Sequence, residues 1–188
     1  MRKRNAAATR RAILDAARRN FAEKSYDQAG LRDIAGEAGV DVAMVGRYFG
    51  NKEQLFREVL RPDDHEGEML LEKVPADELP AYFASLVMDM EHDTSNAKVD
   101  RLMIILRSSS SPQARAMVSE AIEETIIRPI SARLDGEDSR LRAGIALSIL
   151  MGSGILRKVM QQTAVSEVPD DTIRKSLTDM FREALWPR

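Results

Sequence analysis

The stretch GVDVAMVGRYFGNKEQLFREVL, residues 39–60, contains two short helical patterns joined by a glycine-bearing turn. Asp41 can cap the first helix, over residues 42–48. Asn51 can cap the second, with Gln54 three residues later as in a capping box. The first helix has too few residues to be stable alone in water, so it needs a helix to support it.

Residues 31–38 supply such a support, because they predict another short helix directly before residues 42–48. Gly39 ends it in the position where a left-handed residue is usual. The pair fits a helix-turn-helix, in which a short helix enters the DNA major groove, about 12 Å wide. An ordinary helical hairpin inside a bundle fits the same pattern and remains open at this point.

Helical patterns also dominate the rest of the chain, and strand patterns are nearly missing. A first helix lies within residues 9–24, and apolar spacing predicts later ones over residues 76–92, 97–108, 112–134, 141–160 and 170–186. We therefore predict an all-α fold with about nine helices.

Three features stand out from this helical pattern. Residues 61–68 are polar, lack periodicity and carry a proline and a glycine, which predicts a boundary between domains 1–60 and 61–188. Pro129 predicts a kink late in its helix. The segment 141–160 is apolar almost all round, so it should be buried on more than one side.

Composition narrows the functional class. The chain has 188 residues, no cysteine and two histidines, which excludes disulfides and thiolate metal sites. Residues 1–60 hold twelve Lys/Arg against eight Asp/Glu, whereas the remainder holds sixteen against twenty-two. A basic first third suggests a polyanion partner for that part alone. We expect a cytoplasmic protein with no metal, no cofactor and no membrane span.

An enzyme is the main competing class. The segments DDHE, residues 63–66, and EHD, residues 91–93, contain groups that can bind metals, but neither has the spaced histidine pair of a zinc helix. No glycine-rich phosphate loop is present in the sequence. We therefore expect no catalytic activity.

Residues 9–60 resemble the DNA-binding domain of the TetR/AcrR family of bacterial transcriptional regulators. The matching text is AILDAARRNFAEKSYDQAGLRDIAGEAGVDVAMVGRYFGNKEQLF, residues 12–56. The resemblance implies a DNA-binding regulator, associated with the bacterial nucleoid, whose recognition helix covers residues 42–48. The DNA-contacting residues that it implies are Arg32, Val42, Ala43, Met44, Gly46, Arg47, Tyr48 and Lys52.

Four of these residues suit particular groups of the DNA. Arg47 suits guanine, since its guanidinium can bond O6 and N7 together, and Val42 or Met44 suits a thymine methyl. Lys52 begins a helix, where backbone N–H groups favour a phosphate oxygen. The basic N-terminal residues are either a flexible DNA-contacting arm or a solvated terminus, and include Arg2, Lys3, Arg4, Arg10 and Arg11.

Three positions depart from the family's pattern. Ser25 stands where a glycine usually ends the first helix, and Gly30 stands where Thr or Ser usually caps the second. Gly46 replaces an aromatic residue in the recognition helix and costs about 1 kcal/mol of helix propensity relative to alanine. We expect that Gly46 lets the backbone approach DNA closely.

The resemblance also implies functions for the second domain. Its helices would bind a small-molecule effector, and helices 141–160 and 170–186 would pair with a second copy as a homodimer. Candidate effector contacts are Phe83, Val87, Met103, Arg107, Met117 and Met151. The resulting expectation is a repressor, released from a palindromic operator by its effector. The alternative is a helical small-molecule-binding or interaction protein with a weakened DNA-binding domain.

Overall fold

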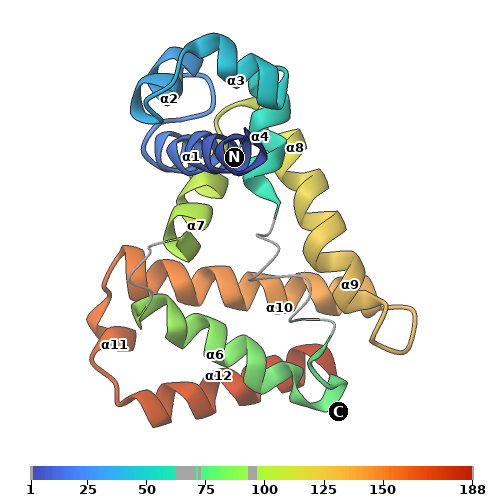
Figure 1. Ribbon diagram of the computed structural model, residues 1–188. Coiled ribbons are helices and arrows are strands. Elements are labelled where there is room, and N and C mark those ends of the chain that lie inside the picture. The colour runs from blue at the N-terminus through green and yellow to red at the C-terminus, as the bar shows by residue number, and fades with distance from the viewer. Residues whose placement is uncertain (1, 62–70, 72, 93–96, 188) are drawn as a thin grey trace. The chain divides into compact units, whose positions relative to one another are not determined.

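The computed structural model describes residues 2–61, 71, 73–92 and 97–187, and its regular structure within these ranges is entirely helical (Figure 1). The predicted all-α fold class is therefore confirmed. The helices are α1 Arg2–Glu23, α2 Leu31–Glu37, α3 Val42–Phe49, α4 Lys52–Leu60, α6 Leu79–His92, α7 Ala97–Ser108, α8 Pro112–Ile122, α9 Arg128–Ser131, α10 Ser139–Gly154, α11 Thr163–Ser166 and α12 Asp170–Leu185.

The chain folds into two compact units. The first contains Met1–Arg61 and Asp100–Ala121, and the second contains Pro62–Val99 and Ile122–Arg188. The first segment of the first unit ends next to the predicted boundary at residue 60. That unit also takes most of α7 and α8 from the region predicted as the second domain. The helical segment that starts with α8 therefore begins in one unit and ends in the other.

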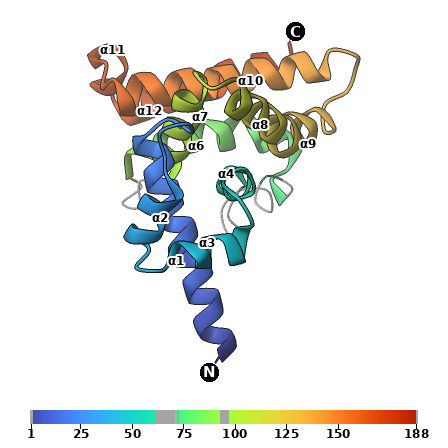
Figure 2. The same ribbon diagram turned by 90° about the horizontal axis from the view of Figure 1, so that it is seen from above.

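Three aromatic rings form the centre of the first unit. The Phe56 ring of α4 lies edge-to-face against Phe21 of α1 and Tyr26 of the following loop, with both centroid distances 4.9 Å. The α1 side chain of Asn20 is also buried, and its amide donates hydrogen bonds to the Ala16 carbonyl at 3.0 Å and to Glu37 of α2. The result is a fixed position for α2 and α4 on α1 (Figure 2).

The N-terminal residues form a helix, not a flexible arm. Helix α1 begins at Arg2, because the sequence Ala6-Ala7-Ala8 has the highest intrinsic helix propensity. Arg10 of this helix forms an ion pair with Glu58 of α4, and its guanidinium lies 5.0 Å from the centroid of the Phe49 ring. Arg10 thus joins α1 to α4 and to the end of α3.

The turn between α2 and α3 closes as the sequence predicts. Gly39 has a φ of +66°. The Val40 N–H donates to the Ala35 carbonyl at 3.0 Å and the Gly39 N–H donates to the Gly36 carbonyl at 3.2 Å. These two bonds define a Schellman motif, and Asp41 then caps α3 by accepting from the Ala43 N–H at 2.8 Å.

In the second unit, α6, α10 and α12 lie side by side (Figure 1). The Phe83 ring of α6 and the Phe181 ring of α12 have centroids 5.5 Å apart within the buried core. Arg142 of α10 donates a hydrogen bond to the Leu185 carbonyl at the end of α12, at 2.6 Å. Helices α10 and α12 therefore pack against each other, and both pack against α6.

Near Pro129, where the sequence predicts a kink, the helix contains a π-helical turn over Glu123–Ile127, between α8 and α9. The Arg128 N–H donates to the Glu123 carbonyl, five residues back, instead of four. Proline cannot donate to the carbonyl of Thr125, four residues before it, so widening the helix in this turn avoids the clash of its ring.

Helix α10 is less buried within the chain than the sequence predicts. The helical segment Ser139–Val159 is long and apolar enough to cross a membrane by length and composition, yet 17% of its apolar window is buried. A Cβ atom built on Gly144 or Gly152 would meet no described atom within 4 Å. The described part of this chain therefore leaves the surface at both glycines uncovered.

We predict that Gly39→Ala destabilises the protein by about 1–2 kcal/mol, because an alanine must adopt the left-handed conformation there. Gly39→Asn should cost less, since asparagine tolerates that region. Chemical unfolding checks both variants. Gly36→Ala is the control, as its Cβ would lie in open space inside α2. Equal stability of Gly39→Ala and the wild type would contradict this account.

Candidate nucleic-acid interface

Helix α3 has one buried side and one exposed side. Val45 and Phe49, four residues apart, are buried against the first unit, with Val45 only 1% exposed. The opposite side carries four exposed residues, which we call the reading face: Val42, Ala43, Gly46 and Arg47. Burial of one side therefore determines which residues α3 presents to solvent.

The reading face combines one long cation with small or apolar groups. Arg47 is exposed and makes no hydrogen bond or ion pair with another described residue. Val42, an apolar side chain, is 40% exposed. A Cβ atom at Gly46 would meet nothing within 4 Å, so the backbone is open to solvent at this point. Such a face suits the major groove, where Arg47 can bond guanine.

The other predicted α3 residues are less accessible. Met44 and Tyr48 are half-buried at the edges of the reading face. Arg32, the second residue of α2, is exposed and bonds no other described residue. The exposed guanidinium groups of Arg32 and Arg47 thus come from both helices of the helix-turn-helix.

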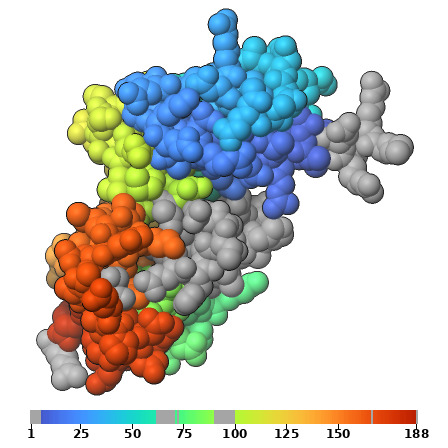
Figure 3. All heavy atoms as spheres, turned by 90° about the vertical axis from the view of Figure 1, so that its left-hand side faces the viewer, coloured from blue at the N-terminus to red at the C-terminus, as the bar shows by residue number. Residues whose placement is uncertain are grey.

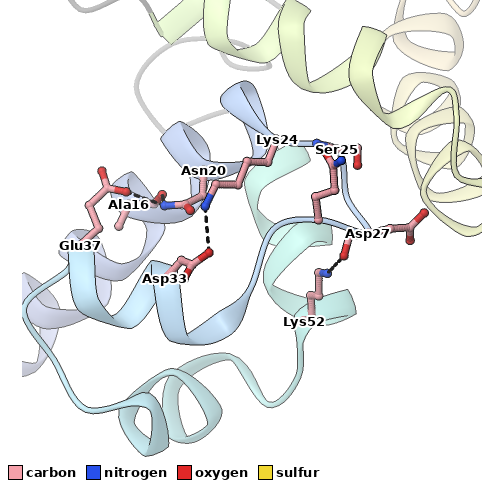
Figure 4. Close-up of polar contacts among 9 residues, drawn as sticks. Ala16, Asn20, Lys24, Ser25, Asp27, Asp33, Glu37 and Lys52 are labelled. Carbon is pink, nitrogen blue, oxygen red and sulfur yellow. Dashed lines mark hydrogen bonds and ion pairs between the residues drawn. The ribbon is translucent and has the colours of Figure 1, made fainter.

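The cap of α2 is weak, as its sequence predicts. Gly30 occupies the N-cap with extended dihedral angles and has no side chain to accept a hydrogen bond. A Cβ atom there would lie 3.5 Å from Asp33 Oδ2, an ordinary contact distance. The Asp33 carboxylate instead binds Lys24 of α1 at 2.8 Å (Figure 4). Space for a capping serine therefore exists at Gly30.

Lys52, predicted to meet a phosphate, lies half-buried at the start of α4. Its Nζ lies 4.7 Å from the centroid of the Tyr26 ring and donates to the Asp27 backbone carbonyl at 3.5 Å (Figure 4). Burial lowers the pKa of Lys52, while the negative charge of Asp27 acts in the opposite direction. The Lys52 ammonium thus contacts the loop that follows α1.

Sequence reasoning missed three contacts that join α8 to this region. The Ser111 hydroxyl donates to Asp27 Oδ1 at 3.2 Å. Two residues on, the Gln113 amide donates to Glu53 of α4 at 3.2 Å, and Glu120 forms an ion pair with Arg57 of α4. No local pattern could have found these pairs, since their partners lie 60 or more residues apart.

The predicted effector contacts are divided between the two units. Phe83 and Val87 belong to the buried core of the second unit, where Met151 is half-buried on α10. In the first unit, Met117 is buried, Met103 half-buried and Arg107 exposed. Each unit therefore contains three of the six predicted residues, and neither contains the whole set.

Comparison with known proteins places this geometry in a family. Residues 13–59 match the model for bacterial regulatory proteins of the tetR family. Residues 77–185 match the model for the tetracyclin repressor-like C-terminal domain. The chain belongs to the TetR family. It is accordingly a DNA-binding transcriptional regulator, as the resemblance of residues 9–60 implied.

Several TetR-family relatives cover nearly the whole chain. The transcriptional repressor Rv3405c of Mycobacterium tuberculosis is 29% identical over 179 residues, which are 94% of this chain and 88% of that protein. Among solved structures, NalD, a secondary repressor of the MexAB-OprM multidrug efflux pump in Pseudomonas aeruginosa, has a TM-score of 0.70 at 23% identity and covers 96% of this chain and 98% of its own. Bacillus subtilis FadR in complex with stearoyl-CoA has a TM-score of 0.65 at 19% identity, covering 94% and 98%.

We predict that Gly46→Ala stabilises the protein by up to about 1 kcal/mol, because alanine is the better helix former and its methyl group meets open space. The same methyl group should weaken DNA binding if the backbone approaches the bases at this point. Thermal unfolding and fluorescence anisotropy with operator DNA measure the two effects.

The matched control is Gly36→Ala, which makes the same change on α2, also in open space. It should stabilise the protein without loss of DNA affinity. Unchanged affinity in Gly46→Ala would show that close approach is not the reason for this glycine.

Proposed function

We propose that this TetR-family regulator is a homodimeric repressor that binds a pseudo-palindromic operator and leaves it when a small molecule binds. The observation that supports this most directly is the reading face of α3, with Arg47 exposed and bonded to no other described residue. Its site of action is the bacterial cytoplasm, at the nucleoid.

On the DNA, α3 lies in the major groove with Val42, Ala43 and Gly46 against the base edges. Arg47 bonds a guanine, and Val42 or Met44 contacts a thymine methyl. The remaining cations bind phosphates: Arg32 from α2 and Lys52 from the start of α4, with the Tyr48 hydroxyl beside them. These contacts set the register, and Arg47 supplies most of the base recognition.

The second copy binds along α10 and α12. Apolar side chains recur on the outer side of α10 at helical spacing, and Leu141 and Ile145 are 62% and 43% exposed. Leu156 and Val159 extend this side, and the open glycines 144 and 152 lie on it too. Figure 3 shows the end of α10, α11 and α12 at the surface, in orange to red. An exposed apolar helix side of this length favours burial against a second copy in a two-fold symmetric dimer.

The effector binds in the second unit and changes the distance between the two recognition helices of the dimer. It can do so only by binding the DNA-free state more tightly than the DNA-bound state. Named repressors among the relatives, and stearoyl-CoA in the FadR structure, support a ligand-responsive repressor as the class. Among the effector candidates, Phe83, Val87 and Met151 belong to this unit, whereas Met103, Arg107 and Met117 belong to the first unit.

Selection from random duplex DNA tests the function. We expect a pseudo-palindrome whose half-sites are about 34 Å, one helical turn, apart, with a guanine in each half-site. Arg47→Ala should relax the preference at that guanine and lower operator affinity by about 10- to 100-fold, in line with about 1–3 kcal/mol per bidentate contact. Recovery of no motif, with weak binding that is lost at moderate salt, would contradict the proposal.

The dimer is tested by a charge on α10. Ile145→Glu should weaken dimerisation by at least about 100-fold, because a symmetric interface buries two uncompensated carboxylates. Analytical ultracentrifugation measures the change. Ala116→Glu, at an exposed position of α8, is the control and should remain dimeric. A dimeric Ile145→Glu variant would exclude this side of α10 as the interface.

A further inference from the structure

The Ser111 hydroxyl makes two hydrogen bonds at the start of α8. Its side chain is nearly buried, at 3% exposure for the residue. The hydroxyl oxygen accepts from the Ala114 N–H at 3.5 Å, which caps α8, and its proton is donated to Asp27 Oδ1 at 3.2 Å. One hydroxyl group therefore both starts a helix and orients a carboxylate.

Asp27 uses its backbone and its side chain in different directions. The backbone carbonyl accepts from Lys52 Nζ, whereas the carboxylate points away from Lys52 (Figure 4). A carboxylate is a stronger partner for an ammonium than a carbonyl, because both groups are charged. The Asp27 carboxylate, the stronger partner, therefore makes no hydrogen bond to Lys52 here, although Asp27 and Lys52 lie close together.

We propose that Ser111 restrains the Asp27 carboxylate so that the Lys52 ammonium stays available to a DNA phosphate, and that displacement of the start of α8 releases this carboxylate to compete with the phosphate. Ser111 and Asp27 are positioning residues that act through Lys52. The inference rests on the phosphate contact of Lys52 in the proposed function.

Helix α8 is suited to carry such a signal. Gln113 and Glu120, seven residues apart and so on one side of α8, bond Glu53 and Arg57 on one side of α4. The same helical segment continues through its π-helical turn into the second unit. A change that starts in the second unit can therefore reach the corner at Asp27 through a single helix.

The test measures operator affinity over a range of salt concentrations. Ser111→Ala should bind about 3- to 10-fold more weakly. The slope of log K against log salt should also become shallower by up to about 2 in the dimer, since each lost phosphate contact contributes about 0.9. A loss of helix capping alone would not change this slope.

Asp27→Asn separates the two effects, because its amide keeps the shape and can still accept from Ser111 but carries no charge. The double variant Ser111→Ala/Asp27→Asn should recover wild-type affinity within about twofold, along with the full salt slope. Ser111→Asp is a second probe: it retains a capping acceptor but repels Asp27, so it should show the same shallow slope.

Ser109→Ala is the matched control. The Ser109 hydroxyl is exposed and donates to the Leu106 carbonyl at 2.7 Å within its own turn, so its removal should leave affinity and slope unchanged. Circular dichroism confirms that each variant is folded at the assay temperature.

Lys52→Met, measured in parallel, separates a failure of the Lys52–phosphate contact from a failure of the restraint on Asp27. If its salt slope equals that of the wild type, Lys52 does not bind a phosphate, and that contact of the proposed function fails together with the inference. If Lys52→Met has the shallow slope but Ser111→Ala and Ser111→Asp do not, only the restraint on Asp27 is overturned. Failure of Asp27→Asn to rescue Ser111→Ala would overturn it as well.

Discussion

The contact of Phe56 with Phe21 and Tyr26 determines the geometry of the whole DNA-binding unit. Aromatic pairs of this kind prefer the edge-to-face arrangement seen here, and they bury large apolar areas. Because these rings join α1, its following loop and α4, they set where α4 begins. The start of α4 in turn fixes Lys52 and the end of α3. A reading helix of eight residues is too short to be stable alone, so it depends on packing against these neighbours.

Two glycines lower the stability of helices in the DNA-binding unit. Gly30 leaves the N-cap of α2 without a side-chain acceptor, and Gly46 lies in a helix where any other residue but proline would be more favourable. Neither position is crowded, so packing does not explain either residue. Gly46 has a functional rationale in the close approach of the backbone, whereas nothing in the structure explains Gly30.

In the second unit, the notable feature is a helix with apolar residues on both a buried and an exposed side. Its core is assembled around α6 and α12, with Phe83 and Phe181 at the centre, and α10 contributes one side to it. The other side of α10 is apolar and exposed within the described chain. A helix with two apolar sides can bury both only if it has two partners. The proposed homodimer would cover the second side of α10.

Local signals were enough to predict the helices and their caps. The left-handed Gly39 and the caps at Asp41 and Asn51 all depend on interactions within a few residues, so the amino-acid order itself determines them. The family followed from residues in register along α1 to α4, and the candidate DNA contacts on α3 followed from that resemblance.

Tertiary structure decided the features that join distant parts of the chain. Lys52 is seated on Tyr26 and Asp27, Arg10 is bound to Glu58, and α8 belongs with α4, none of which a local pattern encodes. The physical reason is that an ion pair or hydrogen bond between residues 84 positions apart depends on how the helices pack, and packing depends on the whole core. The sequence by itself therefore determined which segments are helical and how α3 and α4 begin, and the packing of those helices decided what each charged side chain touches.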